Sequence, residues 1–257
     1  AFSSSRKAFI ARKARRRMAI LISASSAGVL AAAVFLARRR IKAAPAPTPG
    51  ALPQALVGGF EPRGLIGRGS LGEVHEAFDK TRGRRAVLKV LRPELLADPA
   101  GLERLLAQAR AGTALSHPNI AALYSIERAG TQVCLAFEFV EGRTLQRLLQ
   151  ERRRLDWPTA LLLLKGTAAA LQYAHGRGVI HGNLKPSKIM FGADGTVKIL
   201  DFAVGDEARR MPPYLAPDQE QGRVSTAVDL YALSVVFYEM LTGELPFKGP
   251  NYLAQKR

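Results

Sequence analysis

Three glycines and one lysine form the first pattern in this sequence that could do chemistry. The stretch "GLIGRGSLGEVHEAF", residues 64–78, contains Gly67, Gly69 and Gly72 and continues to Val74. A glycine turn lets backbone N–H groups approach a phosphate because no side chain intervenes. Lys89 follows in the apolar run "RAVLKVL", where it is either a solvated edge residue or a phosphate ligand. On a strand that follows a glycine turn, we favour the phosphate ligand.

A β-hairpin and a third strand must position these residues. The segment "EVHEAF" alternates as a strand does, so the glycines form a hairpin turn and not the start of a dinucleotide-binding helix. The apolar run "QVCLAFEFV" is typical of a further strand, with Cys134 as a small buried residue. Apolar spacing predicts helices in "LERLLAQARAGTAL", "WPTALLLLKGTAAALQYAH" and "VSTAVDLYALSVVFYEML". The last of these is apolar on nearly every side and should lie inside a lobe.

Together these motifs resemble the protein kinase family, specifically the serine/threonine kinases common in bacteria. The resemblance covers residues 60 to about 250 and includes, in family order, "HPNI" at 117, "LDFA" at 200, "YLAPDQ" at 214 and "DLYALSVVFYEMLTGELPF" at 229. It implies an α+β, protein-kinase-like bilobal fold in a domain over residues 60–257. The β-rich small lobe would span about 60–140 and the helical large lobe about 141–257. Since the family continues through further helices, we expect the chain to be a fragment with an incomplete large lobe.

The resemblance implies that ATP is bound between the two lobes. The glycine turn would cover the phosphates, and Lys89 would contact the α- and β-phosphates. The backbone from Glu138 to Val140 would face the adenine. Val74 and Met190 would lie above and below the adenine ring.

The sequence departs from the family where catalysis needs it most. Asn183, in "VIHGNLKPSKIM", occupies the position of the catalytic base, and an amide cannot accept the hydroxyl proton. Lys188 stands at the second metal-ligand position, where an ammonium cannot ligate Mg²⁺ and repels it. Asp201 remains as a metal ligand and Lys185 as a γ-phosphate contact. We therefore expect ATP as cofactor and Mg²⁺ as a doubtful one, with Lys188 able to substitute for one metal ion.

Residues that control activity in the family are changed as well. Counting back from the "HPNI" motif, the helix glutamate that pairs with the lysine falls on Gln108. Glu103 lies roughly 140° around that helix, so Lys89 should lack its usual ion pair. Residues 201–217 contain no Ser or Thr to phosphorylate. Three more family positions are replaced, at Gly182, Ala203 and Met211.

The N-terminal segment carries most of the net charge. The formal charge is +17, and eleven of these charges lie in residues 1–60, which contain no acid before Glu61. Residues 18–37 are uncharged, and as a helix they would span roughly 30 Å, so they form a candidate transmembrane helix. A basic segment, 1–17, precedes this run, and a basic and Pro-rich linker, 38–59, follows it. An organelle-targeting peptide is the alternative.

These features give expected partners and a location. Residues 6–17 carry seven basic residues and residues 38–42 carry four, which mildly favours a cytoplasmic N-terminus, although an ATP-dependent domain also needs the cytoplasm. We expect a single-pass protein in the lipid bilayer, with the kinase-like domain cytoplasmic. Residues 61–257 carry the remaining net charge of +6, and they contain no basic stripe interleaved with aromatic residues. We therefore expect no nucleic-acid partner.

Three functions follow from the sequence. The first is a membrane-tethered pseudokinase that binds nucleotide and acts as a scaffold or allosteric regulator of a signalling protein partner. The second is an active but atypical serine/threonine kinase that works without a base, because phosphoryl transfer needs little general-base help. The third is an interaction module with an empty cleft.

Overall fold

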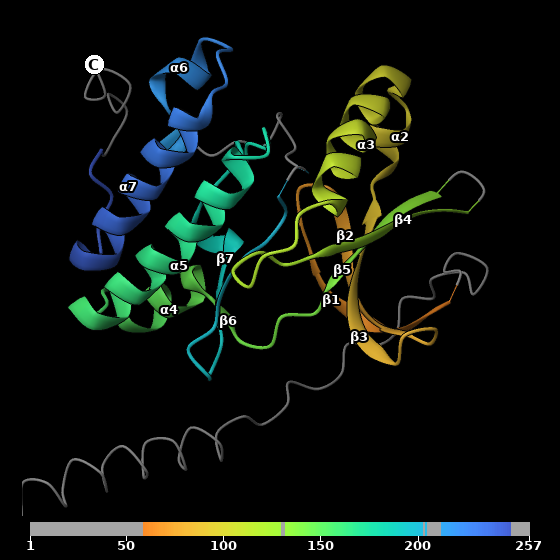
Figure 1. The fold of residues 1–257 in the computed structure, drawn as a ribbon, viewed down its shortest axis with the longest axis horizontal. Coiled ribbons are helices and arrows are strands. Elements are labelled where there is room, and N and C mark those ends of the chain that lie inside the picture. Colours follow the sequence, from red (N-terminus) through yellow and green to blue (C-terminus); the bar gives the residue numbers. More distant parts are fainter. Residues whose placement is uncertain (1–58, 130–131, 203, 205–211, 248–257) are drawn as a thin grey trace, which may run out of the picture. The chain divides into compact units, whose positions relative to one another are not determined.

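The computed structural model describes residues 59–129, 132–202, 204 and 212–247 (Figure 1). The basic segment 1–17, the candidate transmembrane helix 18–37 and all of the linker 38–59 except Gly59 lie outside the described residues. Ala203 and Met211 lie outside them as well. Within the described ranges, no helix combines the length and the apolar character needed to cross a bilayer. The described residues form a sheet-rich lobe and a helical lobe, which confirms the predicted α+β bilobal fold.

A five-stranded antiparallel sheet forms the small lobe (Figure 1). Its strands are β1 (Phe60–Arg68), β2 (Gly72–Asp79), β3 (Arg84–Leu91), β4 (Leu123–Ala129) and β5 (Gln132–Glu138), arranged in the order β1-β2-β3-β5-β4. The glycine segment is the turn between β1 and β2, as predicted. Strand β2 pairs with β3 without a register shift, and this places Val74 opposite Lys89.

Two helices follow the third strand, the short α2 (Pro93–Leu96) and α3 (Pro99–Thr113). Helix α3 begins after Asp98, whose side chain accepts a 3.0 Å hydrogen bond from the Gly101 N–H, and a proline occupies its first turn. Its buried face packs with strand residues in the core of the small lobe. That core contains Leu105, Leu106, Ala109, Leu123 and Leu135.

The tip of the glycine turn belongs to the same core. Leu71 is only 4% exposed and lies in the cluster with Leu91, Leu106 and Val204. The Arg92 N–H donates a 2.8 Å hydrogen bond to the Leu71 carbonyl. The turn is therefore held against the lobe by an apolar side chain and a backbone hydrogen bond.

The described part of the large lobe contains four helices and a small sheet (Figure 1). The helices are α4 (Leu145–Arg152), α5 (Trp157–His175), α6 (Pro217–Glu220) and α7 (Thr226–Thr242). The sheet has the order β6 (Arg143–Thr144), β7 (Ile189–Phe191), β8 (Val197–Ile199), and two 3₁₀ turns are η2 (Pro186–Lys188) and η4 (Pro212–Tyr214). Helix α5 packs against α7 and β8, and the three predicted helical runs are confirmed.

The expectation that α7 lies wholly inside the lobe is wrong for one of its faces. Val228 and Val236 are buried, but Leu230 is 53% exposed and Tyr238 is 45% exposed. These two residues and the exposed Ser234 are four residues apart, so they share one side of the helix. Apolar composition on every side therefore did not identify the face that remains accessible.

Candidate functional site

Asp201 is shared by two lysines from different parts of the chain. The Lys89 ammonium donates to Oδ1 of Asp201, and the Lys188 ammonium donates to Oδ2. The side chain of Asp201 is 5% exposed, that of Lys89 12% and that of Lys188 16%. Each carboxylate oxygen therefore has its own ammonium partner in a largely buried position.

Local backbone structure brings these three side chains together. Lys89 lies on β3, the central strand of the sheet, paired with Leu135 of β5. Lys188 ends η2, where its N–H donates to the Lys185 carbonyl and its carbonyl accepts from the Leu200 N–H, each at 2.8 Å. Lys188 is thus anchored beside the residue that precedes Asp201.

Asp201 has an unusual backbone conformation. Its φ is +63°, one of two positive values among the described residues other than glycine. The left-handed region costs a side-chain-bearing residue roughly 1–2 kcal/mol, and such strain persists only where the surroundings hold it. Its carboxylate contacts two lysines, and its carbonyl accepts a 3.4 Å hydrogen bond from the Val204 N–H.

Burial and neighbouring charges oppose each other in this cluster. Burial alone would raise the pKa of the Asp201 carboxyl, but the two ammonium groups outweigh it and hold that pKa well below its usual range. Burial lowers the pKa of Lys89, as does Lys188, while Asp201 acts in the opposite direction. Burial and Lys188 also lower the pKa of Lys185. With all four groups ionised the cluster carries an excess of two positive charges, which suits a polyphosphate.

The glycine turn closes over this cluster. The Gly69 N–H donates a 2.7 Å hydrogen bond to the Gly72 carbonyl. Gly72 has φ +144°, and a Cβ there would collide with backbone atoms of Val90 and Arg92, so only glycine fits. Beneath the turn is a cavity of about 20 Å³. It is lined by Gly69, Ser70, Leu71, Gly72, Val74, Lys89, Lys188 and Asp201.

Six residues singled out from the sequence thus line one cavity, and Gly67 does not. Gly67 lies in β1 opposite Val74, and a Cβ on it would meet no atom within 4 Å. The hairpin therefore needs glycine at its tip more than at this position.

The residues expected to face the adenine, Glu138 to Val140, which we call the hinge, lie at and just after the end of β5. The Glu138 N–H donates a 2.8 Å hydrogen bond to the Ala122 carbonyl, and its carboxylate forms a 2.9 Å ion pair with Lys198. Val140 and Met190 are half-buried, and Met190 of β7 pairs in register with Lys198 of β8. Lys198 ties the hinge to the small sheet of the large lobe, a role for which its sequence position gave no signal.

Asn183 and Lys185 line other cavities than the one beneath the glycine turn. Asn183 borders a cavity of about 10 Å³ together with Tyr214 and Gln219. Lys185 borders a larger pocket of about 320 Å³. The cavities below the glycine turn and beside Lys185 therefore have no lining residue in common.

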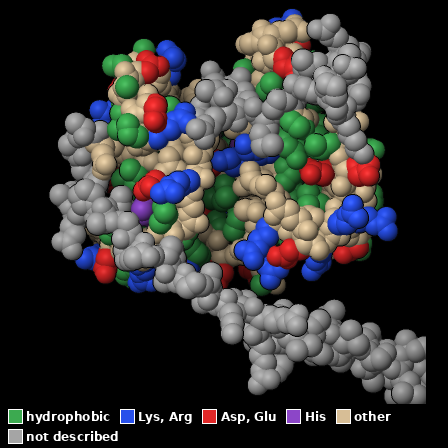
Figure 2. Space-filling model, turned by 180° about the vertical axis from the view of Figure 1, so that it is seen from behind, with side chains coloured by type: hydrophobic (Ala, Val, Ile, Leu, Met, Phe, Trp, Pro, Cys, Tyr) green, Lys and Arg blue, Asp and Glu red, His purple; other side chains and the backbone are tan. Residues whose placement is uncertain are grey.

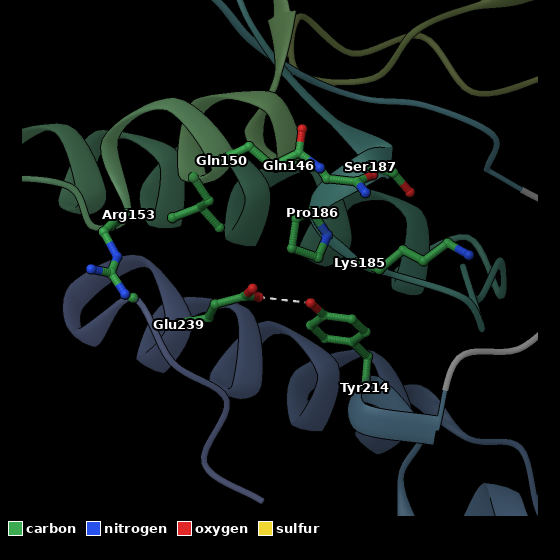
Figure 3. Close-up of a pocket in the computed structure, with 10 residues that line it drawn as sticks. Gln146, Gln150, Arg153, Lys185, Pro186, Ser187, Tyr214 and Glu239 are labelled. Atoms are coloured by element: carbon green, nitrogen blue, oxygen red, sulfur yellow. Dashed lines mark hydrogen bonds between the residues drawn. The ribbon is translucent and has the colours of Figure 1, made fainter. Parts of the chain in front are cut away.

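Figure 3 shows the residues that line the larger of these two pockets. Gln146 and Gln150 line one side, and Glu239 and Tyr214 line the other. The Tyr214 hydroxyl donates a 2.7 Å hydrogen bond to the Glu239 carboxylate (Figure 3). Burial raises the pKa of both groups, and the hydrogen bond raises that of the tyrosine further while partly offsetting the rise for the glutamate.

A buried carboxylate holds the backbone of the loop that contains His181 and Asn183, the catalytic loop. Asp229 of α7 is fully buried and accepts hydrogen bonds from the backbone N–H groups of His181 and Gly182, each at 2.8 Å. It also lies 2.8 Å from His175 Nε2. His181 is buried, with its Nε2 donating to the Leu200 carbonyl at 3.0 Å, so it has a packing role. Sequence reasoning missed Asp229, although an acid within such an apolar helix was a usable signal.

The helix α3 supplies no carboxylate to Lys89. Glu103 pairs with Arg128 at 2.9 Å, on the exposed side of the helix, so the expected loss of the usual ion pair is confirmed for this acid. Gln108 is exposed and forms no hydrogen bond with Lys89 in the described part of the chain. Asp201 has taken over as the carboxylate partner of this lysine.

The site fits a polyphosphate better than it fits Mg²⁺. Three lysines and the backbone of a glycine turn can neutralise and hydrogen-bond phosphate oxygens. Mg²⁺ prefers oxygen ligands at 2.0–2.1 Å, whereas Lys188 presents an ammonium and occupies one oxygen of Asp201. No group of three or more His, Cys, Asp or Glu side chains among the described residues is arranged to hold a metal. This donor set does not suit the metal.

Comparison with known proteins agrees with the kinase-like fold. The family model described as "Protein kinase domain" matches residues 60–256. Serine/threonine-protein kinase PknA of Mycobacterium tuberculosis is 36% identical over 215 residues, covering 77% of this chain and 50% of that protein. A probable serine/threonine-protein kinase PknB of Bifidobacterium longum is 35% identical over 227 residues, covering 79% and 33%. The chain spans half or less of these relatives. Residues 60–256 make this chain a member of the protein kinase family.

Proposed function

We propose that this domain is a pseudokinase, which binds ATP between its lobes but transfers the phosphoryl group weakly or not at all. The observation that carries the proposal is the sharing of Asp201 between Lys89 and Lys188. The carboxylate expected to hold a metal is thereby neutralised within the protein. Its biological role would then be that of a scaffold or allosteric regulator for a signalling partner.

The residues of the cleft support binding more than they support transfer. Bound ATP would supply a triphosphate to neutralise, and Lys89, Lys188 and Lys185 are the cations available for it. Transfer also requires a group that orients the acceptor hydroxyl and accepts its proton. Asn183 has an amide at that position and borders a cavity with Tyr214 instead. ATP binding therefore does not require that this chain also transfers the phosphoryl group.

An active, atypical serine/threonine kinase is the second candidate. Two observations favour it: Lys89 keeps a carboxylate partner, and the 320 Å³ pocket beside Lys185 has room for a segment of substrate. Because phosphoryl transfer has a loose transition state, loss of the base alone need not abolish it. The relatives are named as serine/threonine kinases, and their activity is a hypothesis for this chain.

Membrane tethering forms part of the proposal. Twenty uncharged residues, 18–37, lie between basic segments, which favours a single transmembrane helix. We place the kinase domain on the cytoplasmic side because ATP is available there, against the mild preference of the flanking charges for a cytoplasmic N-terminus. An organelle-targeting peptide is the alternative. Carbonate extraction followed by protease protection of the full chain distinguishes the two, because a cleaved targeting peptide leaves a shortened chain that is released from membranes.

Surface charge supports a protein partner more than a nucleic acid. Figure 2 shows Lys and Arg side chains interspersed with Asp and Glu on the face in view. Nucleic-acid affinity arises from a concentrated basic surface that releases counterions.

The decisive experiment measures ATP binding and autophosphorylation in parallel on the full chain. We expect ATP to bind and no label to be transferred from γ-³²P-ATP. Lys89→Ala should weaken binding, while Lys80→Ala, at an exposed ion pair with Glu61, is the matched control. Transfer that is lost in Lys89→Ala would establish the second candidate. Absence of ATP binding would leave only an interaction module.

A further inference from the structure

We infer that Lys188 is a built-in cation that takes the place of Mg²⁺, so that the cleft binds metal-free nucleoside triphosphate. The inference rests on the proposed nucleotide-binding function and specifies the form of the ligand. It follows from the position of Lys188 on the second oxygen of Asp201, facing the cavity beneath the glycine turn.

The two lysines occupy the places where a metal would need oxygen atoms. Lys89 uses Oδ1 of Asp201 and Lys188 uses Oδ2, so a metal ion that binds the carboxylate must share an oxygen with an ammonium or displace that ammonium. A divalent cation would also enter a cluster that already has an excess of positive charge. Both effects disfavour Mg²⁺ before any nucleotide arrives.

The backbone holds Lys188 close to this position. Its N–H and carbonyl are both hydrogen-bonded, to Lys185 and Leu200 at 2.8 Å. The side chain is mostly buried, and together with Lys89 it borders the cavity lined by Gly69 and Gly72. A phosphate that enters under the turn meets two ammonium groups and backbone donors. Each ammonium supplies one compact positive charge, so the two lysines together supply the charge that one Mg²⁺ ion would otherwise bring.

The prediction concerns the form of nucleotide that binds. ATP in water is complexed by Mg²⁺, and a cleft that uses lysines for the same oxygens competes with the metal for them. We therefore expect ATP to bind the full chain at least as tightly in EDTA as in excess Mg²⁺. A site that uses a metal would show the opposite order.

The test replaces Lys188 by asparagine, whose amide oxygen can ligate a metal ion. Binding of ATP to the full chain is measured by calorimetry, in EDTA and in MgCl₂, for the wild type, Lys188→Asn and the control Lys80→Asn. In EDTA, Lys188→Asn should bind about tenfold or more weakly, since one charge-assisted contact is lost. Addition of Mg²⁺ should recover much of this loss, because Asn can ligate the metal and Asp201 regains a free oxygen. Lys80→Asn should behave as the wild type under both conditions.

Adenosine provides the matched ligand control. It lacks phosphates, so its affinity should be the same in the wild type and in Lys188→Asn. Lys188→Met, with a similar length and no charge, should bind ATP weakly in both buffers and serves as a second variant if Lys188→Asn does not fold. Circular dichroism establishes folding of each variant.

The outcomes separate this inference from the proposed function. ATP binding by the wild type only when Mg²⁺ is present overturns the inference and leaves nucleotide binding intact. Equal affinity of wild type and Lys188→Asn in EDTA also overturns it. Absence of ATP binding under both conditions overturns the proposed nucleotide function itself.

Discussion

Replacing Asp201 by asparagine should destabilise the unliganded domain. Asparagine has nearly the same shape but no charge, so Lys89 and Lys188 lose the carboxylate that both contact. Removing one partner of a buried ion pair typically costs 3–5 kcal/mol, because the remaining charge is left uncompensated. The two ammonium groups are 12% and 16% exposed, so water relieves part of the cost, and we expect about 3 kcal/mol.

The effect is large enough to measure by thermal unfolding. For a domain of this size, 1 kcal/mol shifts Tm by about 2–4 °C, so Asp201→Asn should lower Tm by about 6–12 °C at neutral pH without nucleotide. Asp218→Asn is the matched control, because its carboxylate pairs with Arg223 at 2.8 Å where both side chains are more than half exposed. Its effect should stay within about 0.5 kcal/mol. A Tm for Asp201→Asn that equals that of the control would refute the shared-carboxylate argument.

The pH dependence gives an independent check. Because folding lowers the pKa of Asp201, its contribution to the free energy of unfolding is present above the unfolded pKa of about 3.9. That contribution is lost as the pH falls through the lower folded value. The difference in Tm between wild type and Asp201→Asn should therefore be constant between about pH 5 and 7 and shrink only below about pH 4. A difference that disappears near pH 6 would contradict the assignment.

Three further predictions concern residues outside the cluster. Asp229→Ala should cost about 3–5 kcal/mol in urea unfolding, because two buried backbone N–H groups and His175 lose their acceptor. Tyr214→Phe should cost about 1 kcal/mol and leave ATP affinity unchanged, because it removes a hydrogen bond at the pocket beside Lys185 and none in the phosphate cluster. Burial raises the pKa of Cys134 to about 11, so Ellman's reagent should react with this thiol at pH 8 only after unfolding. Rapid reaction of the folded chain would contradict its buried position.

The glycine turn and the strand that carries Lys89 were predictable because both depend on local pattern. A hairpin with glycines at its turn and an apolar strand after it leave little choice of register, and the structure places Val74 opposite Lys89. The loss of the catalytic base at Asn183 and of a metal ligand at Lys188 could also be predicted, since both depend on residue type alone.

The partner of each charged residue was harder to predict. The sequence indicated that Lys188 would repel a metal, but not that its ammonium turns to Asp201, because that contact depends on how η2 and the following strands fold back. The exposure of Gln108 depends on the rotation of α3, which residue counting fixes only approximately. Lys198 and Asp229 make contacts across 60 and 47 or more residues of chain, beyond the reach of any local pattern.

The buried tip of the glycine turn bears on the kinetics of ligand entry. The cavity beneath the turn is about 20 Å³, so the turn lies close over the lysines, and we expect it to lift when a nucleotide binds. Lifting withdraws Leu71 from its contacts with Leu106 and Val204. Association would then be limited by opening of the turn, and its observed rate would level off at high nucleotide concentration instead of rising in proportion. The contacts of Leu71 would therefore set the rate at which a nucleotide associates, separately from the affinity with which it binds.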